Sequence, residues 1–167
     1  MKALVAIFLK FSFNLINGLC PSSLLRAHIL RLFGAQIGNR VKVEKITLMH
    51  YEGFNLSHLI LGNRVYIGPG AILDLKESII IGKSTKIGPG CNISTHVDAG
   101  KENEVSSQFP AKKEAVMIGS GVWIGASTTI LCGTVIGDNA VIGACSLVRS
   151  DIPEGGIAYG VPAKVKK

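Results

Sequence analysis

One histidine stands where a regular part of the sequence gives way to an irregular one. His96 closes the string Ile93-Ser94-Thr95-His96, and the polar segment after it carries charges, paired serines and a proline. An imidazole titrates near neutral pH, so it can take a proton from a hydroxyl group that attacks an electrophile. A lone histidine is usually an ordinary surface residue, but long loops on rigid scaffolds often carry function. We therefore predict that His96 is a general base.

Two further side chains are candidates for contact with the hydroxyl-bearing molecule. Asp74 follows Leu73 where most units of the sequence have glycine, so it is either an acceptor-binding acid or a turn residue. Trp123 is the single tryptophan, and the pattern of its neighbours Val122 and Ile124 turns their side chains inward. Alternation along a strand then points Trp123 outward. An exposed indole needs a cover, which a ligand or another subunit would provide.

All three residues lie on or beside a repeat of six residues that runs from Ile37 to about Val148. An aliphatic residue followed by glycine recurs throughout, as in Ile118-Gly119, Ile124-Gly125, Ile136-Gly137 and Ile142-Gly143. A small or β-branched residue stands two positions earlier, so both side chains of each unit share one face of a strand. The repeat predicts a parallel β-helix with three short faces per coil and about 18 residues per turn. In this interpretation the register slips only twice, once before Ile81 and once before Ile118.

This repeat, the string Val122-Trp123-Ile124-Gly125 and the ending Tyr159-Gly160-Val161-Pro162-Ala163-Lys164 together resemble the hexapeptide-repeat acyltransferases. The similarity is greatest to sugar and polysaccharide O-acetyltransferases of the maltose, galactoside and colanic-acid type. The resemblance implies an all-β fold, a left-handed parallel β-helix with short N-terminal α-helices and one extruded loop. The left hand comes from the resemblance alone, because the spacing does not fix it. We expect a helical segment over 1–33, the β-helix over 34–153 with its loop over 94–115, and a basic tail over 154–167 that completes the cofactor site.

The resemblance also implies an activity, a cofactor and an assembly. It implies direct, acetyl-CoA-dependent acetylation of a sugar hydroxyl, in capsular or exopolysaccharide biosynthesis, with His96 as the base and no covalent acyl-enzyme. Asp74 would bind the acceptor and Trp123 would lie beside the active site. The residues expected at acetyl-CoA are Ala126 and Ala144, whose backbone would line the pantetheine channel, and the cations Arg149, Lys164 and Lys167, near the phosphates and adenine. Family active sites lie between subunits, so we expect a homotrimer.

The charge balance agrees with an anionic ligand. The 167 residues carry a formal net charge of +7, yet no basic stripe with interleaved aromatics suggests nucleic acid, and we expect none as a partner. Three alternatives stay open: an antibiotic or other xenobiotic as acceptor, a non-catalytic β-helix scaffold, and a zinc lyase resembling γ-class carbonic anhydrases. The lyase needs several histidines, and Lys101 stands in the loop where a second one is needed, so we expect no metal.

The N-terminal segment over 1–33 is apolar but interrupted by polar residues before it could span a bilayer. After Pro21 we expect a helix with Leu25, Ile29, Leu32 and Phe33 on one face. The segment would pack on the end of the solenoid or on a neighbouring subunit; the alternative is peripheral contact with a membrane. We reject a signal peptide and expect the protein in the cytoplasm, with the inner membrane face as the place of any such contact.

Overall fold

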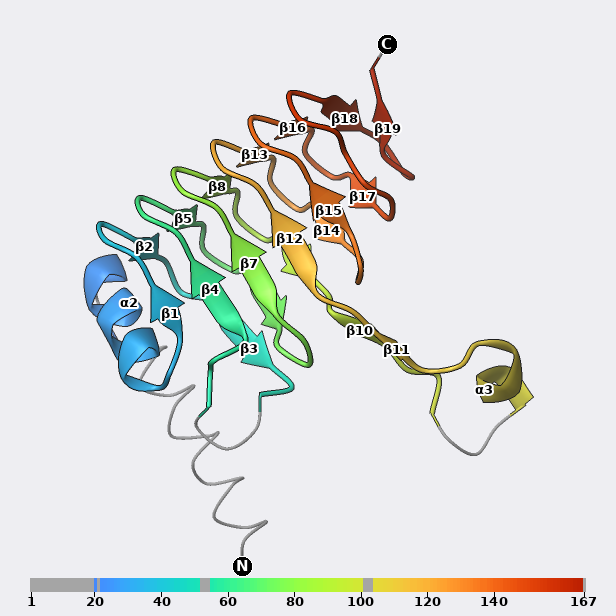
Figure 1. Ribbon diagram of the computed structural model, residues 1–167, viewed down its shortest axis with the longest axis horizontal. Coiled ribbons are helices and arrows are strands. Elements are labelled where there is room, and N and C mark those ends of the chain that lie inside the picture. The colour runs from blue at the N-terminus through green and yellow to red at the C-terminus, as the bar shows by residue number, and fades with distance from the viewer. Residues whose placement is uncertain (1–19, 21, 52–54, 101–103, 167) are drawn as a thin grey trace, which may run out of the picture.

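The chain winds through three short parallel sheets, which form the faces of a triangular solenoid, a left-handed parallel β-helix (Figure 1). A computed structural model describes residues 20, 22–51, 55–100 and 104–166. The first sheet holds β1 (Gln36–Ile37), β4 (Leu59–Leu61), β7 (Ile79–Ile81), β12 (Val116–Ile118) and β15 (Val135–Ile136). The second holds β2 (Lys42–Val43), β5 (Tyr66–Ile67), β8 (Lys86–Ile87), β13 (Trp123–Ile124), β16 (Val141–Ile142), β18 (Ile157–Tyr159) and β19 (Lys164–Val165). The third holds β3 (Thr47–Met49), β6 (Ile72–Asp74), β9 (Asn92–Ile93), β14 (Thr129–Ile130) and β17 (Leu147–Val148).

The six-residue pattern builds the core as predicted. Fully buried aliphatic residues stack in columns along the axis, among them Ile67, Ile87 and Ile124 at 0% exposure. The coils lie so close at their corners that a Cβ added to Gly68 would meet the backbone nitrogen of Pro89 at 2.7 Å. Glycine after the aliphatic residue is therefore needed for close approach of backbones. The all-β, parallel β-helix with one extruded loop is confirmed.

The first coil departs from the predicted register. Ile37 pairs with Leu61, 24 residues later, whereas Ile124 pairs with Ile142, 18 residues later. In β3 the buried residue is Leu48, and Met49, which the unbroken register would turn inward, is 41% exposed. The step from Val43 to Leu48 is one residue short and the step from Leu48 to Leu61 is seven residues too long, so the net excess of the first coil is six and the count to Leu61 stays intact. The prediction of only two slips is wrong for this reason.

Helix α2 (Ser23–Leu32) closes the N-terminal end of the solenoid and buries the predicted face only in part, since Ile29 and Phe33 pack against the core. Arg26, Ala27 and Leu30 are buried, whereas Leu25 is 48% and Leu32 84% exposed. The guanidinium of Arg26 donates to the carbonyl oxygens of Val43, at 3.2 Å, and of Cys20. The end coil has no preceding coil to satisfy its polar backbone groups, so an arginine reaches them where an apolar side chain could not.

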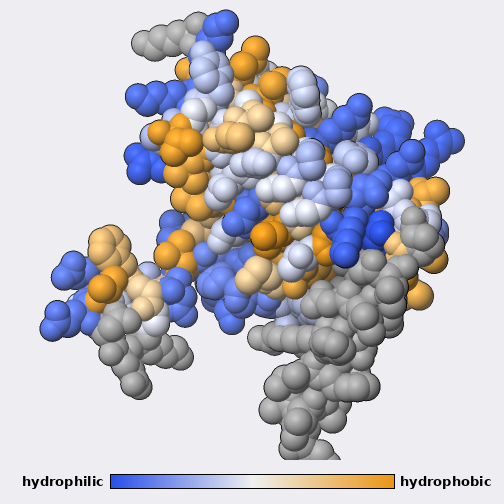
Figure 2. All heavy atoms as spheres, turned by 180° about the vertical axis from the view of Figure 1, so that it is seen from behind, coloured by the Kyte–Doolittle hydropathy of each residue, from blue (hydrophilic) through white to orange (hydrophobic). Residues whose placement is uncertain are grey.

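The loop expected over 94–115 leaves the solenoid as an arm. Its base is a two-stranded antiparallel ribbon, β10 (His96–Val97) with β11 (Lys112–Lys113), and its far end carries α3 (Glu104–Gln108). Seen from behind, the arm is a lobe set apart from the solenoid, with apolar side chains among hydrophilic ones (Figure 2). Val105 and Phe109 on this arm are 53% and 62% exposed.

The C-terminal segment continues the solenoid beyond residue 153, where we expected a basic tail to begin. Strand β18 pairs in parallel with β16, and β19 folds back antiparallel against β18 at the edge of the second sheet. In the described part of the chain no helix is long and apolar enough to cross a membrane. The predictions for residues 1–19 lie outside the described residues.

Candidate active site

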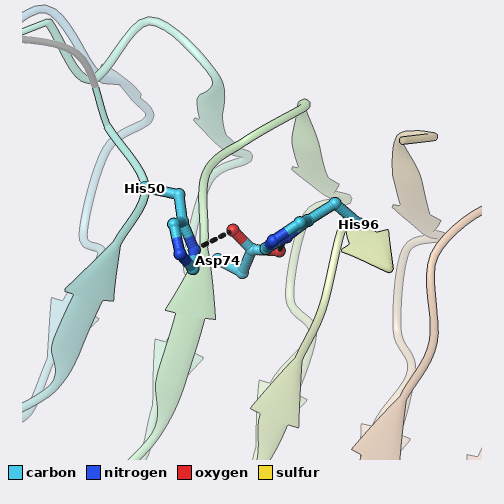
Figure 3. A group of neighbouring side chains, drawn as sticks. All are labelled: His50, Asp74 and His96. Carbon is cyan, nitrogen blue, oxygen red and sulfur yellow. Dashed lines mark hydrogen bonds and ion pairs between the residues drawn. The ribbon is translucent and has the colours of Figure 1, made fainter. Parts of the chain in front are cut away.

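Three side chains from three successive turns of the chain meet where the third sheet turns towards the first (Figure 3). His50 follows β3, Asp74 ends β6, and His96 follows β9 at the foot of the arm. Parallel strands in one sheet end at the same edge, so coils stacked in register bring these residues together. Asp74 lies between the two imidazoles, and both rings turn towards its carboxylate.

The carboxylate of Asp74 is buried and holds both histidines. Its Oδ2 accepts from His96 Nδ1 at 2.5 Å, from the Thr95 backbone N–H at 2.9 Å and from the Thr95 hydroxyl at 3.2 Å. Its Oδ1 accepts from His50 Nδ1 at 2.9 Å and from the Lys76 backbone N–H at 3.2 Å. A carboxylate with this many donors is fixed in orientation, and it fixes the His96 ring in turn.

These contacts decide the charge of Asp74 and the tautomers of its partners. Burial alone would raise the pKa of Asp74, but hydrogen bonds from His96, Thr95 and Lys76 and the attraction of His96 bring it below its ordinary value of 3.8. An ionised carboxylate only accepts hydrogen bonds, so each Nδ1 that faces it carries a hydrogen. The Nε2 of a neutral His96 then has a free lone pair, as a general base requires. The His96 side chain is 22% exposed and so within reach of a ligand.

A groove of about 310 Å³ opens next to this triad. Its lining is mostly polar and includes His50, His58, Lys76, Glu77 and Lys113. Glu77 and Lys113 form an ion pair at 2.8 Å across it, and His58 Nδ1 lies 3.1 Å from the Leu75 carbonyl oxygen. The lining offers hydrogen-bond donors and acceptors in both directions, which suits a molecule rich in hydroxyl groups.

The same triad is the group of described residues whose spacing could hold a metal ion. One donor atom from each of His50, Asp74 and His96 lies within 4.8 Å of the others. Both carboxylate oxygens, however, bond directly to the N–H groups of the two rings, and a metal would have to displace those hydrogens. As arranged, the residues fit a hydrogen-bonded triad better than a metal centre. The loop contains no second histidine, as the sequence indicated, but His50 comes close to His96 from another coil.

The residues predicted at acetyl-CoA lie elsewhere on the solenoid. Ala126 and Ala144 follow β13 and β16 at the corner between the second and third sheets, and the Ala126 carbonyl accepts from the N–H of Cys145 at 2.8 Å. Trp123 in β13 is 61% exposed on the second sheet, so its predicted outward direction is confirmed. Within one chain, the third sheet separates this corner from the corner of His96.

The predicted cations are spread over several elements. Arg149 follows β17 and is exposed, and Lys164 lies in β19 and is exposed. Lys167 lies outside the described residues. Neither Arg149 nor Lys164 lies at the end of β13 or β16, where Ala126 and Ala144 are found. Their roles at the cofactor therefore stay predictions.

Sequence reasoning identified two of the three residues of the triad and passed over His50. It gave Asp74 to the acceptor and left the group that orients His96 open. The structure supplies that group: Asp74 orients His96, and its carboxylate is already occupied by protein donors. The signal for His50 was the loss of the aliphatic–glycine pattern between Val43 and Leu61, where the spacing nevertheless stays a multiple of six.

Known proteins are similar to this chain in sequence and in fold. Residues 115–150 match the family described as bacterial transferase hexapeptide (six repeats). The chain is 32% identical to the galactoside O-acetyltransferase of Escherichia coli strain K12 over 145 residues, which are 84% of this chain and 66% of that protein. It is also 30% identical to WcaF of the same strain, an acetyltransferase assigned to colanic acid biosynthesis. The 140 matched residues are 84% of this chain and 72% of that protein. The chain belongs to the hexapeptide-repeat acetyltransferase family.

A solved structure within this hexapeptide-repeat family agrees. The maltose O-acetyltransferase of Clostridium difficile 630 superposes with a TM-score of 0.77 at 27% identity, over 95% of this chain and 83% of that one. The chain spans between 56% and 66% of the length of three of the curated relatives it matches, among them the galactoside enzyme. The comparisons therefore establish the family and the fold of this chain.

Proposed function

We propose that this protein is an acetyl-CoA-dependent O-acetyltransferase that acts on a sugar hydroxyl, with His96 as the general base. The observation that carries the proposal is the contact of His96 Nδ1 with the ionised Asp74 carboxylate at 2.5 Å, which leaves Nε2 as a proton acceptor. The names of the relatives support the reaction class, since they are acetyltransferases with galactoside, maltose or polysaccharide substrates.

The reaction that fits this geometry is a direct transfer. His96 Nε2 takes the proton of the acceptor hydroxyl while its oxygen bonds to the thioester carbonyl carbon, whose oxygen becomes an oxyanion. Asp74 stabilises the imidazolium that forms, and backbone N–H groups would stabilise the oxyanion. The carbon–sulfur bond then breaks, and the departing CoA thiolate takes the proton from His96. The products are the acetyl ester and CoA thiol.

We place the acceptor in the groove beside the triad, where polar side chains can bind several hydroxyl groups. Asp74 contributes there by holding His96, and its predicted direct contact with the acceptor is the less favoured role because its oxygens already have partners. A polysaccharide precursor is our choice of acceptor, on the precedent of WcaF. Packing of residues 1–33 on the solenoid or on a neighbouring subunit belongs to this proposal, with peripheral contact at the inner membrane face as the alternative.

Acetyl-CoA would lie along the corner of Ala126 and Ala144, with cations such as Arg149, Lys164 and Lys167 near its phosphates. The net charge of +7 favours such an anionic cosubstrate. We further propose a homotrimer in which the His96 corner of one subunit faces the Ala126 corner of the next. The separation of the two corners within one chain supports this, as do the exposed Trp123, Val105 and Phe109, which need cover.

The test is acceptor-dependent release of CoA thiol from acetyl-CoA over a panel of sugars, with the wild type beside His96→Ala. Loss of the base should lower kcat by about 10²- to 10⁴-fold while CoA still binds. His28→Ala, a change of a histidine on α2 that lies outside the triad, is the matched control and should keep full activity. Turnover that survives His96→Ala would move the base elsewhere.

The other outcomes separate the remaining candidates. Turnover with an antibiotic and with no sugar would replace the sugar acceptor by a xenobiotic. A protein that binds no CoA and releases no thiol with any acceptor would be a β-helix scaffold, and the proposal would be abandoned.

A further inference from the structure

His50 occupies a backbone conformation that most residues avoid. Its φ is +57°, in the left-handed region, which Arg64 and Ser84 also adopt at turns of the solenoid. The chain turns there out of β3 into the insertion of the first coil. The turn accounts for the positive φ, but it accepts several residue types and does not itself require an imidazole. Its explanation lies in what the ring contacts.

Among the described residues, the His50 ring contacts Asp74 and His96, both members of the triad. Its Nδ1 donates to Asp74 Oδ1 at 2.9 Å, on the opposite side of the carboxylate from His96. Its centroid lies 4.5 Å from that of the His96 ring, with the planes inclined at 73°, an edge-to-face contact. The side chain is 42% exposed and lines the groove. Two imidazoles thus share one carboxylate.

The two imidazoles share the negative charge of one carboxylate, because each donates to a different oxygen of Asp74. The hydrogen bond from a neutral His50 draws negative charge towards Oδ1 and fixes the rotation of the carboxylate, so that Oδ2 stays aimed at His96. A positive charge on His50 would stand beside His96 and oppose the positive charge that His96 gains during the reaction. His50 must therefore be a neutral donor while His96 accepts a proton.

We propose that His50 is a positioning residue that limits, through Asp74, how strongly His96 holds its proton. The inference rests on the proposed role of His96 as the base. A base bonded to an unshared buried carboxylate would keep the proton too firmly to pass it to the leaving thiolate. His50 moderates this hold without touching the reacting atoms.

In the described part of the chain, the other charged groups around His50 are those of the groove. They are His58 and Lys76 on the connections of the first two coils, Glu77 beside Lys76, and Lys113 on the arm. Glu77 and Lys113 neutralise each other in their ion pair. Asp74 and His96 are the ionisable partners that His50 contacts, so the titration of His96 is the quantity to measure.

Two variants separate the hydrogen bond of His50 from its ring. His50→Asn keeps a donor where Nδ1 stands and tolerates the positive φ, but removes the ring. His50→Phe keeps a ring against His96 but removes the donor. His50→Ala replaces it if the phenylalanine variant does not fold.

The measurement is an NMR titration of the His96 imidazole in the wild type and both variants, which needs no acceptor. The midpoint for His96 should rise by roughly half a unit to one unit in His50→Phe and stay near the wild-type value in His50→Asn. The acid limb of the kcat/KM profile for acetyl transfer should move in the same direction. A purely structural role would lower activity at every pH with the limb unmoved.

Three outcomes would overturn the inference: equal His96 midpoints in all three proteins, a shift in His50→Asn alone, or a fall of the midpoint in His50→Phe. Because the titration does not require turnover, a failure of the inference is distinguishable from a failure of the proposed reaction. If only the proposed reaction fails, the His96 midpoints shift as expected while no acceptor is acetylated.

Discussion

At the scale of single residues, the triad of His50, Asp74 and His96 depends on one buried carboxylate. Asp74 is 4% exposed and accepts hydrogen bonds from two side chains of histidine, one hydroxyl and two backbone N–H groups. Burial raises its pKa, but hydrogen bonds from His96 and from the backbone of Thr95 and Lys76, with the attraction of His96, lower the pKa by more. In the proposed mechanism Asp74 therefore serves both catalysis and stability, since the same charge that orients His96 also ties three coils together.

The stability that Asp74 provides should depend on pH. Its folded-state pKa lies below the value of 3.8 for the unfolded chain, so the carboxylate stabilises the fold above that pH. This contribution is lost as the pH falls through the folded-state pKa. Asp74→Asn should lower the free energy of unfolding by roughly 1–3 kcal/mol at pH 7, and the difference from wild type should shrink below about pH 4.

Urea denaturation of both proteins between pH 3 and 7 measures this difference. Asp98→Asn, on the exposed foot of the arm, removes one negative charge outside the triad and is the control. A difference between wild type and Asp74→Asn that is the same at pH 3 and pH 7 would contradict the assignment of the charge.

At the scale of elements, the inward small residues do more than fill space. The Thr85 hydroxyl, fully buried, donates to the Gly119 carbonyl at 2.7 Å and accepts from the Val122 N–H at 3.2 Å, so it ties neighbouring coils together. The Thr128 and Ser146 hydroxyls donate to glycine carbonyls three residues earlier in the chain and so brace the corners. In the described part of the chain, the buried Thr134 hydroxyl has no hydrogen-bond partner.

Thr134→Val should therefore stabilise the solenoid, because it removes an unsatisfied buried hydroxyl and keeps the side-chain shape. We expect the free energy of unfolding to rise by up to about 1 kcal/mol. The matched change Thr85→Val removes a satisfied hydroxyl and strands the Val122 N–H, and it should cost roughly 1–3 kcal/mol. Guanidinium denaturation of the two variants checks the opposite signs; destabilisation of equal size in both would show that Thr134 has a partner.

At the scale of the whole molecule, the triangular cross-section separates the two halves of the proposed site. His96 lies where the third sheet turns to the first, and Ala126 and Ala144 lie where the second turns to the third. A ring of three subunits can bring unlike corners together at each interface, which one chain cannot do. The proposed trimer is thus a requirement of the proposed chemistry.

Complementation between inactive chains tests this arrangement. Ala144→Phe should block the pantetheine channel, and His96→Ala removes the base, so each homotrimer should be inactive. If each site takes the base from one chain and the channel from the next, every mixed trimer regains one intact site. Random mixing of equal amounts should then restore about a quarter of wild-type activity. No recovery in mixtures shown by mass spectrometry to contain both chains would place each site within one subunit.

The sequence by itself determined the architecture, because the period of six is a local property. Each six-residue unit contains its own two inward residues and its own turn. It also placed His96 at the foot of the arm and turned Trp123 outward. Tertiary structure decided the partners of His96. Contacts between coils depend on how many residues each coil contains, and that number changes from 24 at Ile37–Leu61 to 18 at Ile124–Ile142. The insertion that carries His50 left the six-residue count unbroken, so only the stacked coils reveal that His50, Asp74 and His96 meet.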